Sequence, residues 1–171
     1  IKASDGGVTI SGGEPLLQSD FIIELFTKLH EHGISTCIDT SGMFPLTDKI
    51  KKVIDVTDIF LLDIKCINDD ICTWLTGHSN KLELEFARYI SNCGKRLWIR
   101  QVLVPGITDK ESDLVLLRDF LKTINVEKFE FLGYHDLGKY KWEKLGLKYE
   151  LENTPIATKD DLDRAYSIIN S

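Results

Sequence analysis

Five ionisable side chains follow successive predicted strands and have the residue types of a small-ligand site. Carboxylates can hold an ammonium group or a metal ion, whereas a lysine and a histidine can donate hydrogen bonds to an anion. Taken singly, each has an ordinary explanation as a turn, surface or structural residue. Their repeated position after the strands favours a shared site. The five are Glu14, Asp39, Asp63, Lys65 and His135, with Arg100 expected near the interior.

The first of these residues belongs to a Gly-Gly-Glu loop. Gly12 and Gly13 end a predicted strand over residues 8–11, and Glu14 follows them. Two glycines let the backbone approach a ligand closely, and the carboxylate and the exposed carbonyl groups can accept hydrogens from a small amine. A tight turn between a strand and a helix explains the same residues, so this motif alone leaves both interpretations open.

The elements that must position these side chains alternate between strand and helix. Glu14 and Asp39 are 25 residues apart, and Asp39 and Asp63 are 24 apart, which is typical of repeated βα units. Because each strand delivers a polar residue at its carboxyl end, we expect a barrel rather than a doubly wound sheet. The predicted fold class is therefore α/β, a partial (β/α) barrel in a single domain over residues 1–171. The strands are expected at 8–11, 36–38, 59–62, 97–104 and 128–132.

Local patterns set further expectations. The apolar run 59–62 is typical of a strand buried on both faces. Ser19 and Thr158 are predicted helix caps, and residues 108–111 read as a capping box. A helix carrying Leu82, Phe86, Tyr89, Ile90 and Cys93 as its apolar stripe is expected before Gly94. Residues 139–151 read as an ordered loop.

Composition limits the classes of partner. The net charge is −6 and no long basic run occurs, which disfavours nucleic acid and acidic membranes. No apolar run approaches the roughly 18 residues of a membrane-spanning helix, so a cytoplasmic location is expected. The four cysteines lack the short spacing of a local metal or redox pair, which indicates reduced core cysteines. They are Cys37, Cys66, Cys72 and Cys93.

The start of the chain sets another expectation. The sequence begins with Ile1 and almost immediately enters a strand, which indicates a fragment that lacks its first βα unit. We expect the strand near Val8 to leave an uncovered sheet edge, through which copies of the fragment could associate.

Six short motifs together carry a resemblance to a known family. They are Ser11-Gly12-Gly13-Glu14-Pro15, Asp39-Thr40-Ser41-Gly42, Leu62-Asp63-Ile64-Lys65, Trp98-Ile99-Arg100, Val104-Pro105-Gly106 and Tyr134-His135-Asp136-Leu137-Gly138-Lys139-Tyr140-Lys141-Trp142. With these motifs the chain resembles the activating enzymes of pyruvate formate-lyase, which are radical S-adenosylmethionine (SAM) enzymes. The resemblance runs over nearly the whole chain, and the last motif is the most specific. Gly133 stands where the family more often has proline.

The resemblance implies a partial (β/α)6 barrel and a set of site residues. SAM would be held by Gly12, Gly13, Glu14, Asp63, Ile64, Lys65 and His135. The first three would meet the amino group, and Lys65 and His135 would meet the carboxylate. A monovalent cation would be bound by the carboxylates of Asp39 and Asp63 and the carbonyl groups of Thr40 and Leu61, because two carboxylates so placed need positive charge between them.

The resemblance also implies an activity, a cofactor and partners. The enzyme would cleave SAM reductively to a 5′-deoxyadenosyl radical, which abstracts a hydrogen from a glycine of pyruvate formate-lyase, with a flavodoxin-type or other reductant. A 4Fe-4S cluster held by a Cys-x3-Cys-x2-Cys loop would supply the electron. No such spacing occurs in this sequence, so we expect the cluster ligands upstream, no catalytic residue within this chain and an inactive fragment.

Three other functions remain open. The chain could activate another glycyl-radical enzyme, because such activases share the Gly-Gly-Glu and Asp-x-Lys elements. It could be a divalent-metal barrel hydrolase with Glu14, Asp39, Asp63 and His135 as ligands, although Lys65 already places a cation beside Asp63. It could also be a binding module that holds SAM or a peptide without catalysis.

Overall fold

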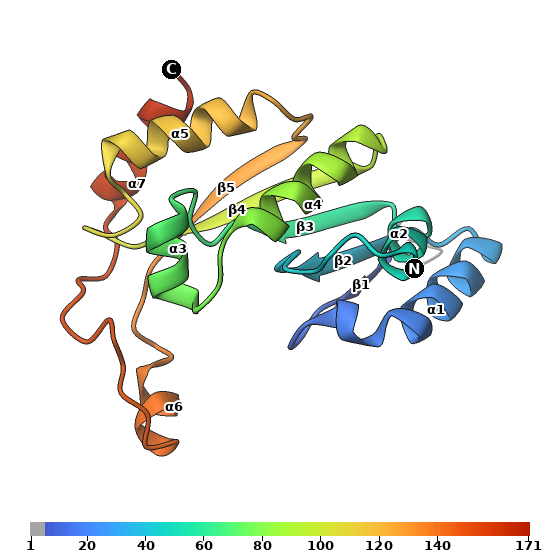
Figure 1. Cartoon of the computed structure of the whole chain (residues 1–171), viewed down its shortest axis with the longest axis horizontal. Helices are drawn as coiled ribbons and strands as arrows, with labels where there is room; N and C mark the ends of the chain where they lie inside the picture. The colour runs from blue at the N-terminus through green and yellow to red at the C-terminus, as the bar shows by residue number, and fades with distance from the viewer. Residues whose placement is uncertain (1–5) are drawn as a thin grey trace.

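The computed structural model describes residues 6–171 and contains one five-stranded parallel sheet (Figure 1). Each strand lies beside its neighbour in the sequence, in the order β1-β2-β3-β4-β5. The sheet is not closed, so the predicted α/β partial barrel is confirmed. The strands are β1 Val8–Ile10, β2 Thr36–Thr40, β3 Ile59–Asp63, β4 Arg96–Leu103 and β5 Lys128–Gly133.

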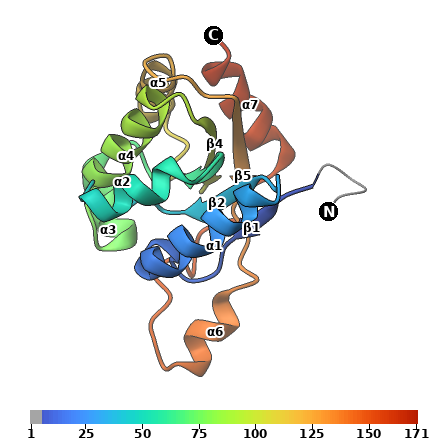
Figure 2. The ribbon, with the colours of Figure 1, turned by 90° about the vertical axis from the view of Figure 1, so that its right-hand side faces the viewer.

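The strand order also explains where the helices lie. Right-handed crossovers between strands that always advance in one direction place their helices on one face of the sheet, whereas a doubly wound sheet reverses direction. The helices are η1 Pro15–Gln18, α1 Ser19–Glu31, α2 Asp48–Asp55, α3 Asp69–Thr76, α4 Lys81–Asn92, α5 Glu111–Leu121, α6 Lys139–Lys144 and α7 Lys159–Ile169. Figure 1 and the view turned by 90° in Figure 2 both show α6 apart from the body of the chain.

The two faces of the sheet differ in burial. Residues alternate between faces along a strand, and the side chains of Ile38, Phe60 and Ile99 are fully buried on the helix-covered face. On the other face, Ile59 and Leu61 are partly exposed. The prediction that strand 59–62 is buried on both faces was therefore wrong. Helices cover only one side of β3, and its other side faces the open interior of the partial barrel.

Several helix boundaries correct the sequence predictions. Helix α3 was not predicted, although Asn68 accepts hydrogen bonds from two backbone N–H groups at its start and Gly77 ends it with φ 80°. Ser19 lies inside α1, where its hydroxyl donates to the Leu16 carbonyl at 2.5 Å instead of capping the helix. The region 139–151, expected as a loop, contains the short helix α6.

The predicted capping box at residues 108–111 is also wrong. The Thr108 hydroxyl accepts from the Val104 N–H at 2.8 Å and donates to the Val102 carbonyl at 3.0 Å, so it stabilises the turn after β4 rather than the start of α5. The cap at Thr158 is confirmed, and there Asp161 completes a capping box for α7.

The cysteines lie in different environments. The structure places Cys66 and Cys72 in the core and Cys37 partly buried on β2, whereas Cys93 is exposed at the end of α4. The expectation of four core cysteines is thus confirmed for Cys66 and Cys72 and wrong for Cys37 and Cys93. Among the described residues, no helix is both long and apolar enough to cross a membrane.

Candidate functional site

The five ionisable side chains lie along the carboxyl edge of the sheet. Because all the strands are parallel, their carboxyl ends share one edge. Glu14 and His135 follow β1 and β5, Asp39 lies near the end of β2, and Asp63 is the last residue of β3, with Lys65 two residues further on. The sequence-predicted residues therefore lie at one edge, although among the described residues no hydrogen bond or ion pair links His135 to the other four.

Arg100 joins two of these carboxylates on the open face. Parallel pairing sets Asp63 beside Arg100 of β4. The Arg100 Nη2 atom lies 2.5 Å from Asp39 Oδ1, and its Nε atom donates to Asp63 Oδ1 at 2.8 Å. Only 21–24% of each of these three side chains is exposed. The positive charge that two neighbouring carboxylates require is thus supplied here by the guanidinium.

The surroundings of Arg100 also shift its pKa. Burial alone would lower the pKa of the guanidinium. The hydrogen bond to Asp39 and the charge of Asp63 outweigh burial and raise the pKa above its usual value. Arg100 therefore remains a fixed cation at this edge. The sequence placed Arg100 near the interior but did not identify its two partners.

Asp63 binds a second cation at the same edge. The ammonium group of Lys65 lies 2.8 Å from Asp63 Oδ2, so the two oxygens of this carboxylate meet different side chains. From the described residues, the second oxygen of Asp39 accepts a single long hydrogen bond, at 3.3 Å, from the exposed hydroxyl of Ser11. A polar ligand can therefore reach Lys65 and the outer oxygen of Asp39.

Glu14 ties the β1 loop to the end of β2. Its Oε1 atom accepts hydrogen bonds from the Thr40 hydroxyl at 2.6 Å and the Leu16 N–H at 3.1 Å. Its Oε2 atom accepts from the Ser41 N–H at 3.0 Å and the Ser41 hydroxyl at 2.7 Å. An ionised carboxylate offers about four acceptor positions, so the chain itself uses this one fully.

The glycine pair next to Glu14 is left open to solvent. Gly12 and Gly13 are exposed, with φ values of 88° and 49°. Apart from each glycine and its chain neighbours, no atom of the described residues lies within 4 Å of the position that a Cβ atom would take. The left-handed backbone favours glycine, and the empty space leaves the peptide groups accessible. Glu14 thus shapes the loop, while the backbone around Gly12 and Gly13 can contact a ligand.

Glu83 is a buried acid beneath this edge that the sequence prediction missed. Its side chain is fully buried, its Oε1 atom accepts from the Lys65 N–H at 3.3 Å, and its Oε2 atom has no partner among the described residues. Burial raises its pKa to about 8. Glu83 shares the inward face of α4 with Phe86 and Ile90, whereas Leu82, expected on that face, is 36% exposed.

His135 is exposed at the same edge, next to a fixed backbone. The preceding residue, Tyr134, donates its N–H to the Leu103 carbonyl at 3.0 Å and accepts from the Ala157 N–H at 2.9 Å. The imidazole can therefore reach a ligand from an anchored position.

The described residues do not form a metal centre. Across residues 6–171, no three histidine, cysteine, aspartate or glutamate side chains lie together in a way that could hold a metal ion. Glu14, Asp39, Asp63 and His135 thus do not provide the ligand set of a divalent-metal hydrolase. The cysteines likewise do not provide the three thiolates of an iron–sulfur cluster.

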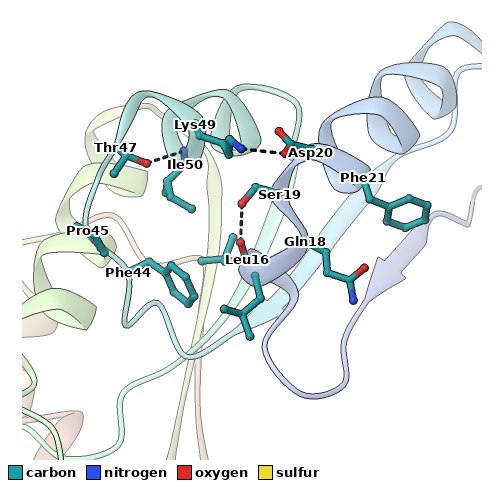
Figure 3. Close-up of a pocket in the computed structure, with 11 residues that line it drawn as sticks. Leu16, Gln18, Ser19, Asp20, Phe21, Phe44, Pro45, Thr47, Lys49 and Ile50 are labelled. Atoms are coloured by element: carbon teal, nitrogen blue, oxygen red, sulfur yellow. Dashed lines mark hydrogen bonds and ion pairs between the residues drawn. The ribbon is translucent and has the colours of Figure 1, made fainter.

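A cavity of about 420 Å³ lies between the start of α1 and the segment before α2 (Figure 3). Lys49 and Asp20 form an ion pair at its rim, with 2.8 Å between Nζ and Oδ2. None of the five edge residues lines it. A second cavity, of about 490 Å³, is lined by Ser41, which bonds to Glu14. The chemistry of the edge, rather than cavity size, therefore identifies the candidate site.

Comparisons with known proteins point to one family. Residues 2–117 match the model of the radical SAM superfamily. The chain is 47% identical over 172 residues to the pyruvate formate-lyase-activating enzyme of Streptococcus mutans, covering 97% of the chain and 65% of that relative. It is 47% identical over 176 residues to that of Staphylococcus epidermidis, covering 99% of the chain and 70% of the relative. The chain thus spans about two thirds of the length of these relatives.

Solved structures share the fold. A domain of a pyruvate-formate lyase-activating enzyme from Bacteroides vulgatus superposes with a TM-score of 0.79 at 22% identity, over 96% of this chain and 93% of the other. Streptococcus suis SuiB bound to S-adenosylmethionine gives a TM-score of 0.68 at 20% identity, over 96% of this chain and 36% of the other. At these identities the likeness supports the fold alone.

The bridge at Arg100 predicts a stability effect. Arg100→Met leaves Asp39 and Asp63 without their shared cation, and we expect it to lower the free energy of unfolding by about 2 kcal/mol, because hydrogen bonds to charged groups contribute roughly 1.5–3 kcal/mol. Arg96→Met is the matched control on the same strand. Arg96 pairs with the exposed Glu127, so its loss should change the free energy of unfolding little. Urea unfolding of both variants measures the difference, and equal losses would contradict the bridge.

The raised pKa of Glu83 predicts a pH dependence. Between pH 4.5 and about 8, the unfolded chain loses this proton while the folded chain keeps it, so this residue makes the free energy of unfolding fall as the pH rises. The slope is at most about 1.4 kcal/mol per pH unit. Glu83→Gln should remove this part of the slope, whereas Glu85→Gln, at an exposed position of the same helix, should keep it. Denaturant unfolding from pH 5 to 8 tests this, and identical slopes would show that Glu83 is ionised in the fold.

Proposed function

Because this chain belongs to the radical SAM superfamily and, within it, to the pyruvate formate-lyase-activating enzymes, we propose that its carboxyl edge holds SAM for activation of a glycyl-radical enzyme. One observation carries the proposal. Exposed backbone at Gly12 and Gly13 lies at the same sheet edge as the cationic Lys65 and the imidazole of His135. This edge therefore offers groups for both a cation and an anion.

The donor and acceptor set fits the amino-acid end of SAM. Its ammonium group would donate to backbone carbonyl groups of the Gly12–Gly13 loop, which Glu14 holds in place through its four hydrogen bonds. Its carboxylate would accept from the Lys65 ammonium and the His135 ring. The loop thus binds through its backbone, and the Glu14 carboxylate acts as a positioning group.

Net charge supports the same assignment. SAM carries a sulfonium, an ammonium and one carboxylate, and is a net monocation. At the edge, Glu14, Asp39 and Asp63 face two permanent cations, Arg100 and Lys65, and the buried Glu83 is largely neutral near pH 7 because its pKa is raised to about 8. Among these five groups the carboxylates exceed the cations by one, so they do not repel the net positive charge of the ligand.

Two further residues have narrower roles. The Ile64 side chain is fully buried and its N–H donates to the Arg100 carbonyl at 2.9 Å, so it would contact SAM only through its carbonyl group. Asp63 would share Lys65 with the SAM carboxylate. This sharing keeps the lysine ammonium oriented toward the site before the ligand arrives.

A monovalent cation remains part of the proposal. Its ligands would be the carboxylates of Asp39 and Asp63 and the carbonyl groups of Thr40 and Leu61, which neighbouring strands bring together. The Thr40 hydroxyl is already bonded to Glu14, which leaves its carbonyl as the ligand. Such a cation would share the two carboxylates with the guanidinium of Arg100.

The described residues lack the ligands of an iron–sulfur cluster. A 4Fe-4S cluster would supply the electron for reductive SAM cleavage, and in an activating enzyme the resulting radical would take a hydrogen from a glycine of the protein substrate. Within residues 6–171 the side chains do not fit such a cluster, so this chain's residues bind and orient SAM only. We propose that the cluster ligands lie outside this chain, which the greater length of the relatives accommodates.

The proposal also includes a protein substrate, a reductant and a cellular location. Relatives at 45–47% identity are named as pyruvate formate-lyase-activating enzymes, which favours pyruvate formate-lyase over another glycyl-radical enzyme. A flavodoxin-type reductant and a cytoplasmic location are proposed from the motif resemblance.

Lys65 provides the direct test of the SAM site. Lys65→Ala removes a charge-assisted contact, so we expect SAM to bind at least tenfold more weakly, a loss of roughly 1.5–3 kcal/mol. Lys28→Ala is the control, because Lys28 also pairs with a carboxylate, Glu24, at 2.6 Å but lies on the surface of α1. Isothermal titration of SAM into the three proteins makes the comparison. If Lys65→Ala and Lys28→Ala bind SAM equally well, Lys65 is not in the site.

A further inference from the structure

Exposed large apolar side chains are concentrated on residues 136–156, here called the α6 arm. Leu145 is 72% exposed and Leu137 is 73% exposed, although both are large aliphatic residues. Large apolar side chains gathered on one segment mark an interaction surface more often than isolated ones do. The exposed large apolar residues of the arm are Leu137, Tyr140, Trp142, Leu145, Leu147 and Ile156.

Side-chain contacts, as well as its two ends, hold the α6 arm to the rest of the chain. The hydroxyl of Tyr149 lies 2.7 Å from that of the buried Tyr134 at the end of β5. Lys139 forms an ion pair with Glu152 at 3.1 Å across the arm, and the rings of Trp142 and Tyr149 are packed with 5.8 Å between their centroids. The leucines are thus presented by a preformed surface, which reduces the entropy lost when a partner binds.

The lysines of the arm are concentrated in one part of it. Over residues 136–156, four lysines balance four acidic residues, but all four lysines lie in residues 139–148 beside a single glutamate. Among residues 6–171, Lys141 and Lys144 form no ion pair, and Lys144 lies over the ring of Tyr140 at 5.3 Å. A matching surface would combine apolar side chains with carboxylates.

The position of the arm identifies the kind of partner. It starts directly after His135 at the carboxyl edge, and its far end returns there, where the Ala157 N–H donates to the Tyr134 carbonyl at 2.9 Å. Figures 1 and 2 show it extending from this edge, away from the helices that cover the sheet. A small ligand at the edge would leave the arm uncovered. A folded protein that inserts a glycine segment into the edge would lie against it.

We propose that the α6 arm is a docking surface for the folded body of the protein substrate, at an acidic and apolar patch beside its glycine segment. This inference rests on the proposed function, because only a protein substrate extends beyond the SAM site. The leucines and aromatic rings supply the buried contact area, and Lys141 and Lys144 supply the complementary charge. A whole protein substrate would gain affinity from contacts with the α6 arm. A short peptide that contains only the glycine segment would not make these contacts.

Binding of intact pyruvate formate-lyase tests the proposal without requiring catalysis. Leu147→Glu is compared with Leu116→Glu on α5, because both leucines are 53% exposed in the native chain. We expect Leu147→Glu to weaken binding of the lyase at least tenfold and Leu116→Glu to leave it unchanged. Lys141→Glu, which changes charge without touching the apolar residues, should weaken it severalfold. Biolayer interferometry gives the affinities, and circular dichroism confirms that each variant is folded.

Other results would overturn the docking proposal. The proposal is wrong if Leu147→Glu and Leu116→Glu bind the lyase with equal affinity. It is also wrong if the native chain does not bind the lyase. Dimerisation lost in Leu147→Glu, seen by sedimentation velocity, would assign the arm to a second copy of this chain. Binding to phosphatidylglycerol vesicles lost in the same variant would assign it to a membrane. Titration of SAM separates the two proposals. A native chain that does not bind SAM contradicts the proposed function. Normal SAM binding together with unchanged lyase affinity in the arm variants contradicts the docking proposal alone.

Discussion

The interaction on which the carboxyl edge depends is the bridge from Arg100 to Asp39 and Asp63. Parallel pairing of β2, β3 and β4 brings the two carboxylates close together on the face that no helix covers. Without a cation between them, their repulsion would oppose the strand register that creates the site. The guanidinium offsets this repulsion through contacts of 2.5 and 2.8 Å and leaves the outer oxygen of Asp63 to orient Lys65 at 2.8 Å. One arginine on β4 thus stabilises the sheet and sets the charge of the site at the same time.

A second constraint acts beneath the same edge. Glu14 and Glu83 are both carboxyl groups close to the ligand side of the sheet, yet their surroundings give them opposite roles. Glu14 accepts four hydrogen bonds and fixes the glycine loop, whereas Glu83 is buried with one oxygen unpartnered among the described residues, and its pKa is raised to about 8. The edge therefore presents backbone carbonyl groups and a lysine to a ligand, while most of its carboxylate oxygens bond within the chain.

The parallel sheet and the edge residues could be predicted from the sequence, because alternating strands and helices at spacings near 25 residues determine both. The partners of Arg100 could not, because they depend on the register between strands that lie far apart in the sequence. Burial of β3 on one face only was missed because a continuous apolar run does not reveal which side the helices cover. Glu83 could have been found from its i, i+3 and i+7 spacing with Phe86 and Ile90, which places it on the inward face of α4. Helix α6 has too few residues for a periodic pattern to show it, whereas α3 could have been found from Asn68 at its start and Gly77 after its end.

We propose that this chain binds SAM at its carboxyl edge but does not itself hold the electron source. The most direct measurement is formation of 5′-deoxyadenosine from SAM under anaerobic conditions, after incubation with iron and sulfide and with dithionite as reductant. The chain alone is compared with a fusion that adds the part of the Streptococcus mutans relative that it does not match. We expect product from the fusion and none from the chain alone, because residues 6–171 bring no three thiols together. Product from the chain alone would contradict the claim, and so would the absence of product from a fusion that binds both the cluster and SAM.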